Sequence, residues 1–201
     1  MSDARVQMTE ATTMKLAIPV TERDHVIGPS GASITVVNYG DYQSPGSGKR
    51  HREIQKIVDE LRSAVRFVYR HFPLVKVHPD ALSAAGAAEA AAAQGKFWEM
   101  HRRLYRRPDK LGDRHLRRHA REIGLDLDKF DREMASRTYA DQIMKDYYNS
   151  LIAGISGAPT TFINGNLYAI TGVDLLEAVR GILKDQNTRL RKIDATTTHV
   201  S

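Results

Sequence analysis

The chain has 201 residues, of which 41% are hydrophobic and 27% are charged, as in ordinary globular domains. It contains no cysteine, which excludes disulfides, thiolate metal sites and cysteine nucleophiles. A net charge of +6 would suit nucleic acid or an anionic surface. However, the aromatic residues do not alternate with the basic ones as an RNA-binding sheet requires. We therefore expect a merely basic surface and no nucleic-acid partner.

The chain shows no membrane or export signal. No run of about 18 apolar residues occurs, so we expect no membrane partner. The first twenty residues lack the continuous apolar stretch of a signal peptide, which predicts a cytoplasmic location. Residues 1–30 are polar and irregular and predict a flexible N-terminal arm. Within it, "KLAIPV" (15–20) is a candidate short strand at the edge of a sheet.

The first part of the chain predicts a strand, a helix and a second strand. The β-branched run at 32–40 is bounded by glycines and favours a buried strand. Apolar residues between 48 and 62 recur at spacings of three and four, which is typical of a helix with one buried face. Residues 64–74 alternate between apolar and basic types, which predicts a second strand. Two strands joined by such a helix are normally parallel.

A helical block follows, and the chain then returns to strands. Residues 78–153 carry only helical periodicity, beginning with an alanine-rich segment. "TTFIN" (160–164) and "LYAIT" (167–171) flank Asn164 and Gly165, which predicts a β-hairpin. An amphipathic helix is expected over 173–183, with a frayed polar chain beyond it. The expected divisions are an arm at 1–30, a core at 31–77 and 154–185, a helical insertion at 78–153 and a tail at 186–201.

Four stretches in this order carry a family resemblance. They are "NYGDYQSPGSGK" (38–49), "FVYRHFPLVKVHPDA" (67–81), "AAAQGKFWEMHRRLY" (91–105) and "GAPTTFING" (157–165). Together they resemble the DsbA-like thiol–disulfide oxidoreductases over about residues 15–183. The resemblance implies an α/β protein with a thioredoxin fold and an all-helical insertion.

The departure from this family lies at its active site. The family's two catalytic cysteines match Ser44 and Ser47 here. In the family, the first cysteine sits at a helix N-terminus, where the helix dipole stabilises a thiolate that attacks a disulfide. A serine hydroxyl can neither form a disulfide nor ionise at neutral pH without a base. The resemblance therefore implies an oxidoreductase by family that is redox-inactive in this chain.

Three explanations for the serines remain open. One or both cysteines were replaced by serine in the laboratory, or the chain is a natural redox-inactive relative that keeps its groove as a binding surface; one natural and one engineered serine would combine the two. Alternatively, the site binds glutathione, because the Ser-Pro pair also resembles kappa-class glutathione transferases and hydroxychromene-carboxylate isomerases. In those relatives a serine hydroxyl donates a hydrogen bond to the glutathione thiolate. A plain helix N-cap role for Ser44 is compatible with all three.

The resemblance also identifies a binding edge. It implies that Pro159 is cis, faces Ser44, and follows a residue whose backbone pairs with an extended substrate segment. We expect Tyr42, Pro45, Ala158 and Pro159 to line a shallow groove into which Ser44 faces. The implied partners are protein thiols, extended peptide segments or glutathione, and no other cofactor is expected.

Asp41 directly precedes this turn. A carboxylate there is a candidate general base or pKa tuner. The alternative interpretation is a strand-end residue that accepts hydrogen bonds from nearby backbone N–H groups.

Several histidines are candidate metal ligands. His71, His78 and His101 fall on separate predicted elements without a short paired spacing. His115 and His119 have the i,i+4 spacing that can hold zinc, but arginines surround them and only Glu122 offers a third ligand. We therefore predict no metal site.

Overall fold

The computed structural model describes residues 14–169 and 174–197. In these ranges the strands are β1 (His25–Ile27), β2 (Ile34–Gly40), β3 (Val65–His71), β4 (Thr160–Ile163) and β5 (Asn166–Leu167). The helices are α1 (Pro45–Glu60), α2 (Ala81–Ala92), α3 (Phe97–Arg106), α4 (Asp113–Glu122), α5 (Leu127–Ala135), α6 (Ala140–Ile152) and α7 (Leu175–Thr197).

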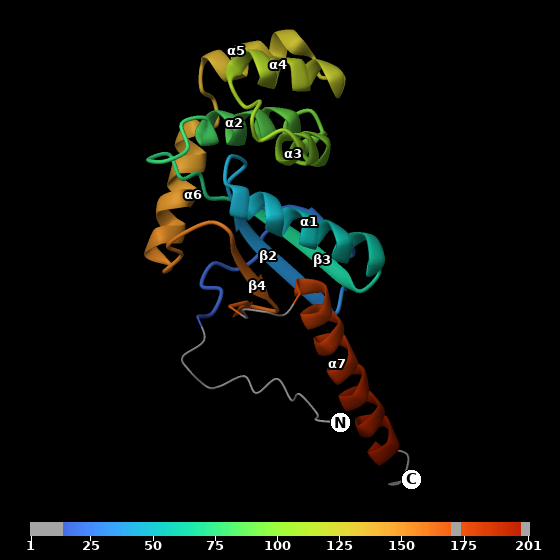
Figure 1. Ribbon diagram of the computed structural model, residues 1–201. Helices are drawn as coiled ribbons and strands as arrows, with labels where there is room; N and C mark the ends of the chain where they lie inside the picture. Colours follow the sequence, from blue (N-terminus) through green and yellow to red (C-terminus); the bar gives the residue numbers. More distant parts are fainter. Residues whose placement is uncertain (1–13, 170–173, 198–201) are drawn as a thin grey trace.

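The strands form one mixed sheet in the order β1-β3-β2-β4-β5. The central pair, β2 and β3, is parallel and is joined by α1, as the sequence predicts. Strands β1, β4 and β5 are antiparallel to their neighbours. Figure 1 shows this sheet with the helical insertion at one of its ends. The architecture is the predicted thioredoxin fold with a helical insertion.

Both faces of β2 are buried, which explains its nearly continuous apolar sequence. Because strand side chains alternate, Val36 and Val37 enter separate apolar clusters. Val36 packs in a cluster with residues of α1 and α7, including Ile57 and Val179. Val37 packs in the other cluster, against which Tyr147 of α6 also lies. The sheet thus has a helix layer on each face.

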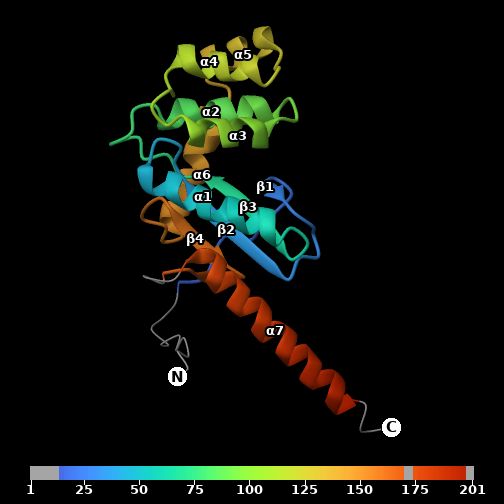
Figure 2. The same ribbon diagram turned by 45° about the vertical axis from the view of Figure 1, so that its right-hand side comes forward.

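The insertion is built around the alanine-rich helix α2. Its buried residues are all alanines, whose small side chains let neighbouring helices approach closely. Helices α3, α4, α5 and α6 all contact it. Figure 2 shows α4 and α5 stacked beyond α2 and α3, at the end of the sheet.

The two ends of the chain differ from the sequence-based expectations. Residues 25–27, assigned to an irregular arm, form edge strand β1 and pair with β3. Lys15 makes a β-bridge to Asn166, while residues 1–13 lie outside the described part of the chain. The expectation of a frayed chain beyond Lys184 is wrong, because α7 continues to Thr197. Among the described residues, no helix is both long enough and apolar enough to cross a membrane, this 23-residue helix included.

The predicted hairpin forms, although its second strand is short. Asn164 and Gly165 have φ values of 47° and 77°, the left-handed conformation that a tight two-residue turn requires. Pairing covers only Asn166 and Leu167 of the second strand. Positions 170 and 171 of the expected strand lie outside the described residues.

A first prediction concerns Gly40, the last residue of β2. A Cβ atom at this position would lie 2.5 Å from Tyr105 Oη and 2.7 Å from Tyr69 Cε2, both of which belong to buried side chains. Gly40→Ala should therefore lower the free energy of unfolding by about 1–3 kcal/mol through overpacking. Urea unfolding measures this. Gly31→Ala is the control, because no atom lies within 4 Å of an added Cβ there. Equal stability of the two variants would contradict the prediction.

Candidate functional site

Strand register brings the two halves of the predicted site together. Tyr39 of β2 pairs with Thr160 of β4, so Pro159 lies level with the end of β2, where α1 begins. The Ala158–Pro159 peptide bond is cis. A Cβ added to Gly46 would lie 3.1 Å from Pro159 Cδ and 3.7 Å from Ser44 Oγ. The turn at 44–47 and the proline loop therefore face each other closely.

Ser44 caps the first helix. Its backbone is extended, with φ −75° and ψ 122°, and its Oγ accepts a hydrogen bond from the Ser47 N–H at 3.3 Å. Pro45 occupies the first helical position, where its missing N–H costs nothing. The predicted N-cap is confirmed. The expectation that Ser44 faces into an open groove is wrong, since the residue is only 6% exposed.

Ser47 lies beneath the turn and is fully buried. Its Oγ accepts a hydrogen bond from the Asp41 N–H at 3.2 Å. Pro45 and Gly46, by contrast, are exposed. The surface of the turn is thus formed by these two residues, while both serine hydroxyls make backbone hydrogen bonds within it.

Asp41 acts as a structural anchor for the turn. Its side chain accepts hydrogen bonds from the backbone N–H of Gln43 at 2.7 Å and of Leu74 at 2.9 Å. Its second oxygen also lies 2.8 Å from His78 Nδ1. This agrees with the interpretation of Asp41 as a strand-end residue that bonds backbone groups.

The placement of Tyr42 in the groove is wrong. Its side chain is 1% exposed, and its hydroxyl lies 3.0 Å from His101 Nδ1. Tyr42 joins Tyr69, Tyr105 and His51 in a packed aromatic cluster around His101, between the turn and the insertion. This cluster is not visible in the sequence, because its members come from α1, α3, β3 and the turn.

Burial keeps this cluster uncharged at neutral pH. It raises the pKa of Tyr42, Tyr69 and Tyr105 and lowers the pKa of His101 well below its usual range. Burial, helped by the charges of neighbouring arginines, also lowers the pKa of His51 to about 4. The N-terminus of α1 is therefore a main source of positive potential at the turn.

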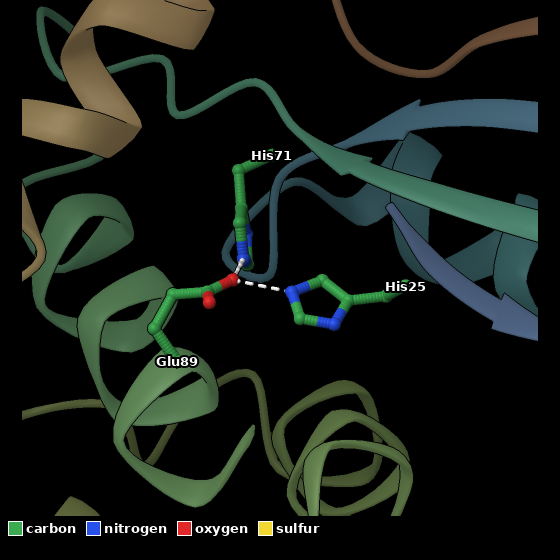
Figure 3. Close-up of side chains that lie close together, drawn as sticks. All are labelled: His25, His71 and Glu89. Carbon is green, nitrogen blue, oxygen red and sulfur yellow. Dashed lines mark hydrogen bonds and ion pairs between the residues drawn. The ribbon is translucent and has the colours of Figure 1, made fainter. Parts of the chain in front are cut away.

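The structure also brings together residues that the sequence left apart. His71 Nε2 and His25 Nε2 both lie beside Glu89 Oε1 (Figure 3). Neither His25 nor Glu89 was singled out from the sequence. One signal was available, since Glu89 is the only charged residue between positions 81 and 93. His119, by contrast, contacts Lys110 O and Arg103.

The shifted pKa of His51 generates a second prediction. The unfolded chain gains a proton at His51 as pH falls through about 6.5, whereas the folded chain gains it only near 4. The free energy of unfolding that His51 contributes is therefore fully present above pH 6.5 and is lost as pH falls towards 4. The loss is at most about 1.4 kcal/mol for each pH unit. His51→Gln cannot titrate and should lose less stability between pH 7 and pH 4.5. Urea unfolding at both values measures the loss.

His115→Gln, on α4, is the matched control and should follow the wild-type protein. If His51→Gln lost as much stability as the wild-type protein over this range, the assignment of the titration to His51 would be refuted.

Comparisons with known proteins agree with this geometry. The chain matches the family described as thioredoxin over residues 20–185. It is 29% identical to a thioredoxin-like oxidoreductase from Silicibacter pomeroyi, with a TM-score of 0.67 and coverage of 86% of this chain and 94% of that one. It also superposes on α-DsbA1 from Wolbachia pipientis with a TM-score of 0.69, at 20% identity, covering 90% and 100% of the two chains.

Curated relatives carry a different name. The chain is 44% identical over 151 residues to "Na(+)/H(+) antiporter NhaA 3" of Salinispora tropica, a match covering 75% of this chain and 23% of that protein. "Na(+)/H(+) antiporter NhaA 1" of Mycolicibacterium gilvum is 34% identical, with coverage of 86% and 29%. The chain thus spans about a quarter of the length of these relatives. From the family match, the chain belongs to the thioredoxin family, with the fold of DsbA-like structures and with Ser44 and Ser47 where the resemblance places the family's two cysteines.

Proposed function

We propose that this domain binds extended peptide segments at the Ala158–Pro159 edge without catalysing thiol–disulfide exchange. The observation that carries the proposal is the close approach of the Ser44–Ser47 turn to Pro159, with hydroxyls at both thiol positions. The family's reaction needs a thiolate to attack and a second thiol to resolve the mixed disulfide. A serine pair supplies neither.

The hydroxyls also lack the partner that would activate them. A serine becomes a nucleophile when an adjacent general base accepts its proton. In the described part of the chain, the Oγ atoms of Ser44 and Ser47 accept hydrogen bonds from backbone N–H groups. The side-chain partner of Ser47 is the Tyr105 hydroxyl, whose raised pKa leaves it protonated and unable to act as a base at neutral pH. We therefore expect neither serine to act as a nucleophile in covalent catalysis.

Exposed apolar side chains support peptide binding. Val75 and Val77 follow β3, in the segment that Asp41 holds, and Leu151 and Ile152 end α6, just before the proline loop. These side chains lie on two separate segments, and exposed apolar groups on segments that lead to a site can contact a bound ligand. The favoured ligand is an extended segment with apolar side chains, whose backbone pairs with the edge before β4.

The redox part of the proposal is tested by restoring the thiols. The wild-type protein should reduce insulin no faster than dithiothreitol alone, since it has no thiol. Ser44→Cys/Ser47→Cys should accelerate the reduction, because the first thiol would sit at the N-terminus of α1. Ser44→Cys alone is the matched control and should lack multiple turnover, having no resolving thiol.

Two results would count against this part. Insulin reduction by the wild-type protein would overturn redox inactivity. An inactive but folded double variant would overturn the claim that the remaining site is competent.

The binding part is tested with a fluorescent insulin B chain whose cysteines are alkylated. Gly46 is exposed and faces Pro159, so Gly46→Leu should cover the proposed edge and weaken binding at least about tenfold by anisotropy. Gly31→Leu places the same side chain in open space at the opposite end of β2 and should bind like the wild-type protein. Equal affinities in both variants, or no binding by the wild-type protein, would refute the peptide edge.

Glutathione is the alternative ligand. Ser44 Oγ accepts one hydrogen bond in the structure, so its proton is directed elsewhere and could be donated to a thiolate. Calorimetry with reduced glutathione separates the two ligands. Binding that is lost in Ser44→Ala, without binding of the alkylated peptide, would replace the peptide proposal with a glutathione-dependent transferase or isomerase.

A further inference from the structure

Three side chains from distant parts of the sequence converge beside the junction of core and insertion. His25 comes from β1, His71 ends β3, and Glu89 lies in the middle of α2. Each offers one ligand atom, and these atoms all lie within 4.8 Å of one another. Figure 3 shows the two imidazole rings and the carboxylate pointing toward a common centre.

The chemistry of this donor set is that of a transition-metal site. Two imidazole nitrogens and one carboxylate oxygen, with a fourth position left for water, are a common zinc set. Calcium and magnesium prefer oxygen ligands and are disfavoured here. The side chains of His25 and Glu89 are each 21% exposed, so an ion and a water molecule can reach the centre.

The orientation of His71 points to the same centre. Its side chain is 8% exposed, and its Nδ1 is buried without a hydrogen-bond partner among the described residues. Burying an unpaired ring nitrogen costs free energy, so the interaction of Nε2 must offset that cost. Nε2 is the atom that faces Glu89.

The surroundings hold the ligands in place. The His25 ring stacks on Phe97 with centroids 3.5 Å apart, and the edge of His71 meets the rings of Tyr42 and Tyr69. These aromatic walls lower the local dielectric and strengthen the attraction between a cation and the carboxylate. We propose that His25, His71 and Glu89 bind one divalent transition-metal ion, zinc by preference, which fastens α2 of the insertion to β1 and β3.

The rearrangement required between the carboxylate and each imidazole is small. His25 Nε2 and His71 Nε2 lie 2.6 Å and 2.7 Å from Glu89 Oε1. Tetrahedral zinc, with bonds of about 2.0–2.2 Å, separates its ligand atoms by about 3.3 Å. Each distance from Glu89 Oε1 to an imidazole nitrogen must grow by roughly 0.6 Å. The Glu89 side chain can move this far because it has three rotatable bonds and is partly exposed. Without the ion, the carboxylate accepts hydrogen bonds from the two imidazoles instead.

The test is a titration of tag-free, metal-stripped protein with Zn²⁺ in competition with a chromogenic chelator at pH 7.5. We expect one equivalent to bind and to raise the melting temperature. Glu89→Gln keeps the shape of the side chain but loses its charge, and His25→Ala removes a partly exposed ligand. Each should weaken binding by more than the roughly 10–100-fold typical of losing an outer-sphere partner. His115→Ala, which breaks the i,i+4 pair on α4, should bind Zn²⁺ like the wild-type protein.

A measurement on the wild-type protein keeps the test independent of variant folding. X-ray absorption of the zinc-loaded protein should show two imidazoles and one carboxylate among the ligands. Circular dichroism establishes which variants are folded before their affinities are compared. The proposal is overturned if the wild-type protein binds no equivalent of Zn²⁺, if folded Glu89→Gln binds as tightly as wild type, or if His115→Ala abolishes binding. In each case the three residues are a hydrogen-bonded clamp only.

Discussion

The hydrogen bonds of the Asp41 carboxylate hold the site in its shape. This one buried side chain bonds the backbone of Gln43 in the turn and of Leu74 in the segment after β3, and it also contacts His78. The end of β2, the start of α1 and the entry to the insertion are therefore tied to a single group. Leaving a buried carboxylate without these partners would cost several times what each bond contributes. The position of Ser44 against Pro159 depends on this anchor.

The same anchor explains why the turn keeps its form without cysteines. Ser44 Oγ accepts from the Ser47 N–H, and Ser47 Oγ accepts from the Asp41 N–H. These bonds satisfy backbone donors at the start of α1 that would otherwise be unpaired. A thiol is a weaker acceptor than a hydroxyl. Serine therefore stabilises the folded turn while removing its redox chemistry, so the shape of this turn carries no evidence of disulfide exchange.

The family resemblance predicted the fold and a helix N-cap at Ser44, and local patterns predicted the elements, but neither predicted the interior of the site. The spacing of apolar residues indicated β2, α1 and β3, and Ser44 followed by Pro45 suits the start of a helix. These are local properties of the backbone. Tyr42 was misplaced because a residue next to a turn can point to either side, and only packing against His101 of α3 decides which.

The histidines illustrate the same limit. An i,i+4 spacing such as that of His115 and His119 is visible in sequence, whereas convergence from β1, β3 and α2 requires the tertiary fold. The edge strand β1 itself escaped detection, since three residues carry too little periodicity to indicate a strand. Without β1, His25 had no predicted position near His71. Missing one short element therefore concealed one member of a three-residue cluster.

The neutral interior beneath the turn determines what the site can do electrostatically. His51 and His101 are held in their neutral forms near pH 7, and the three tyrosines around them remain protonated. No charge from this cluster therefore acts on position 44. The positive end of α1 remains, and the Ser44 side chain lies against it and accepts a hydrogen bond from the Ser47 N–H. A helix terminus stabilises an anion in contact with it, whether the anion belongs to the chain or to a ligand. A thiolate at position 44 would be stabilised directly by the positive end of α1. The serine at this position carries no charge, so the helix terminus can instead stabilise an anionic group of a bound ligand.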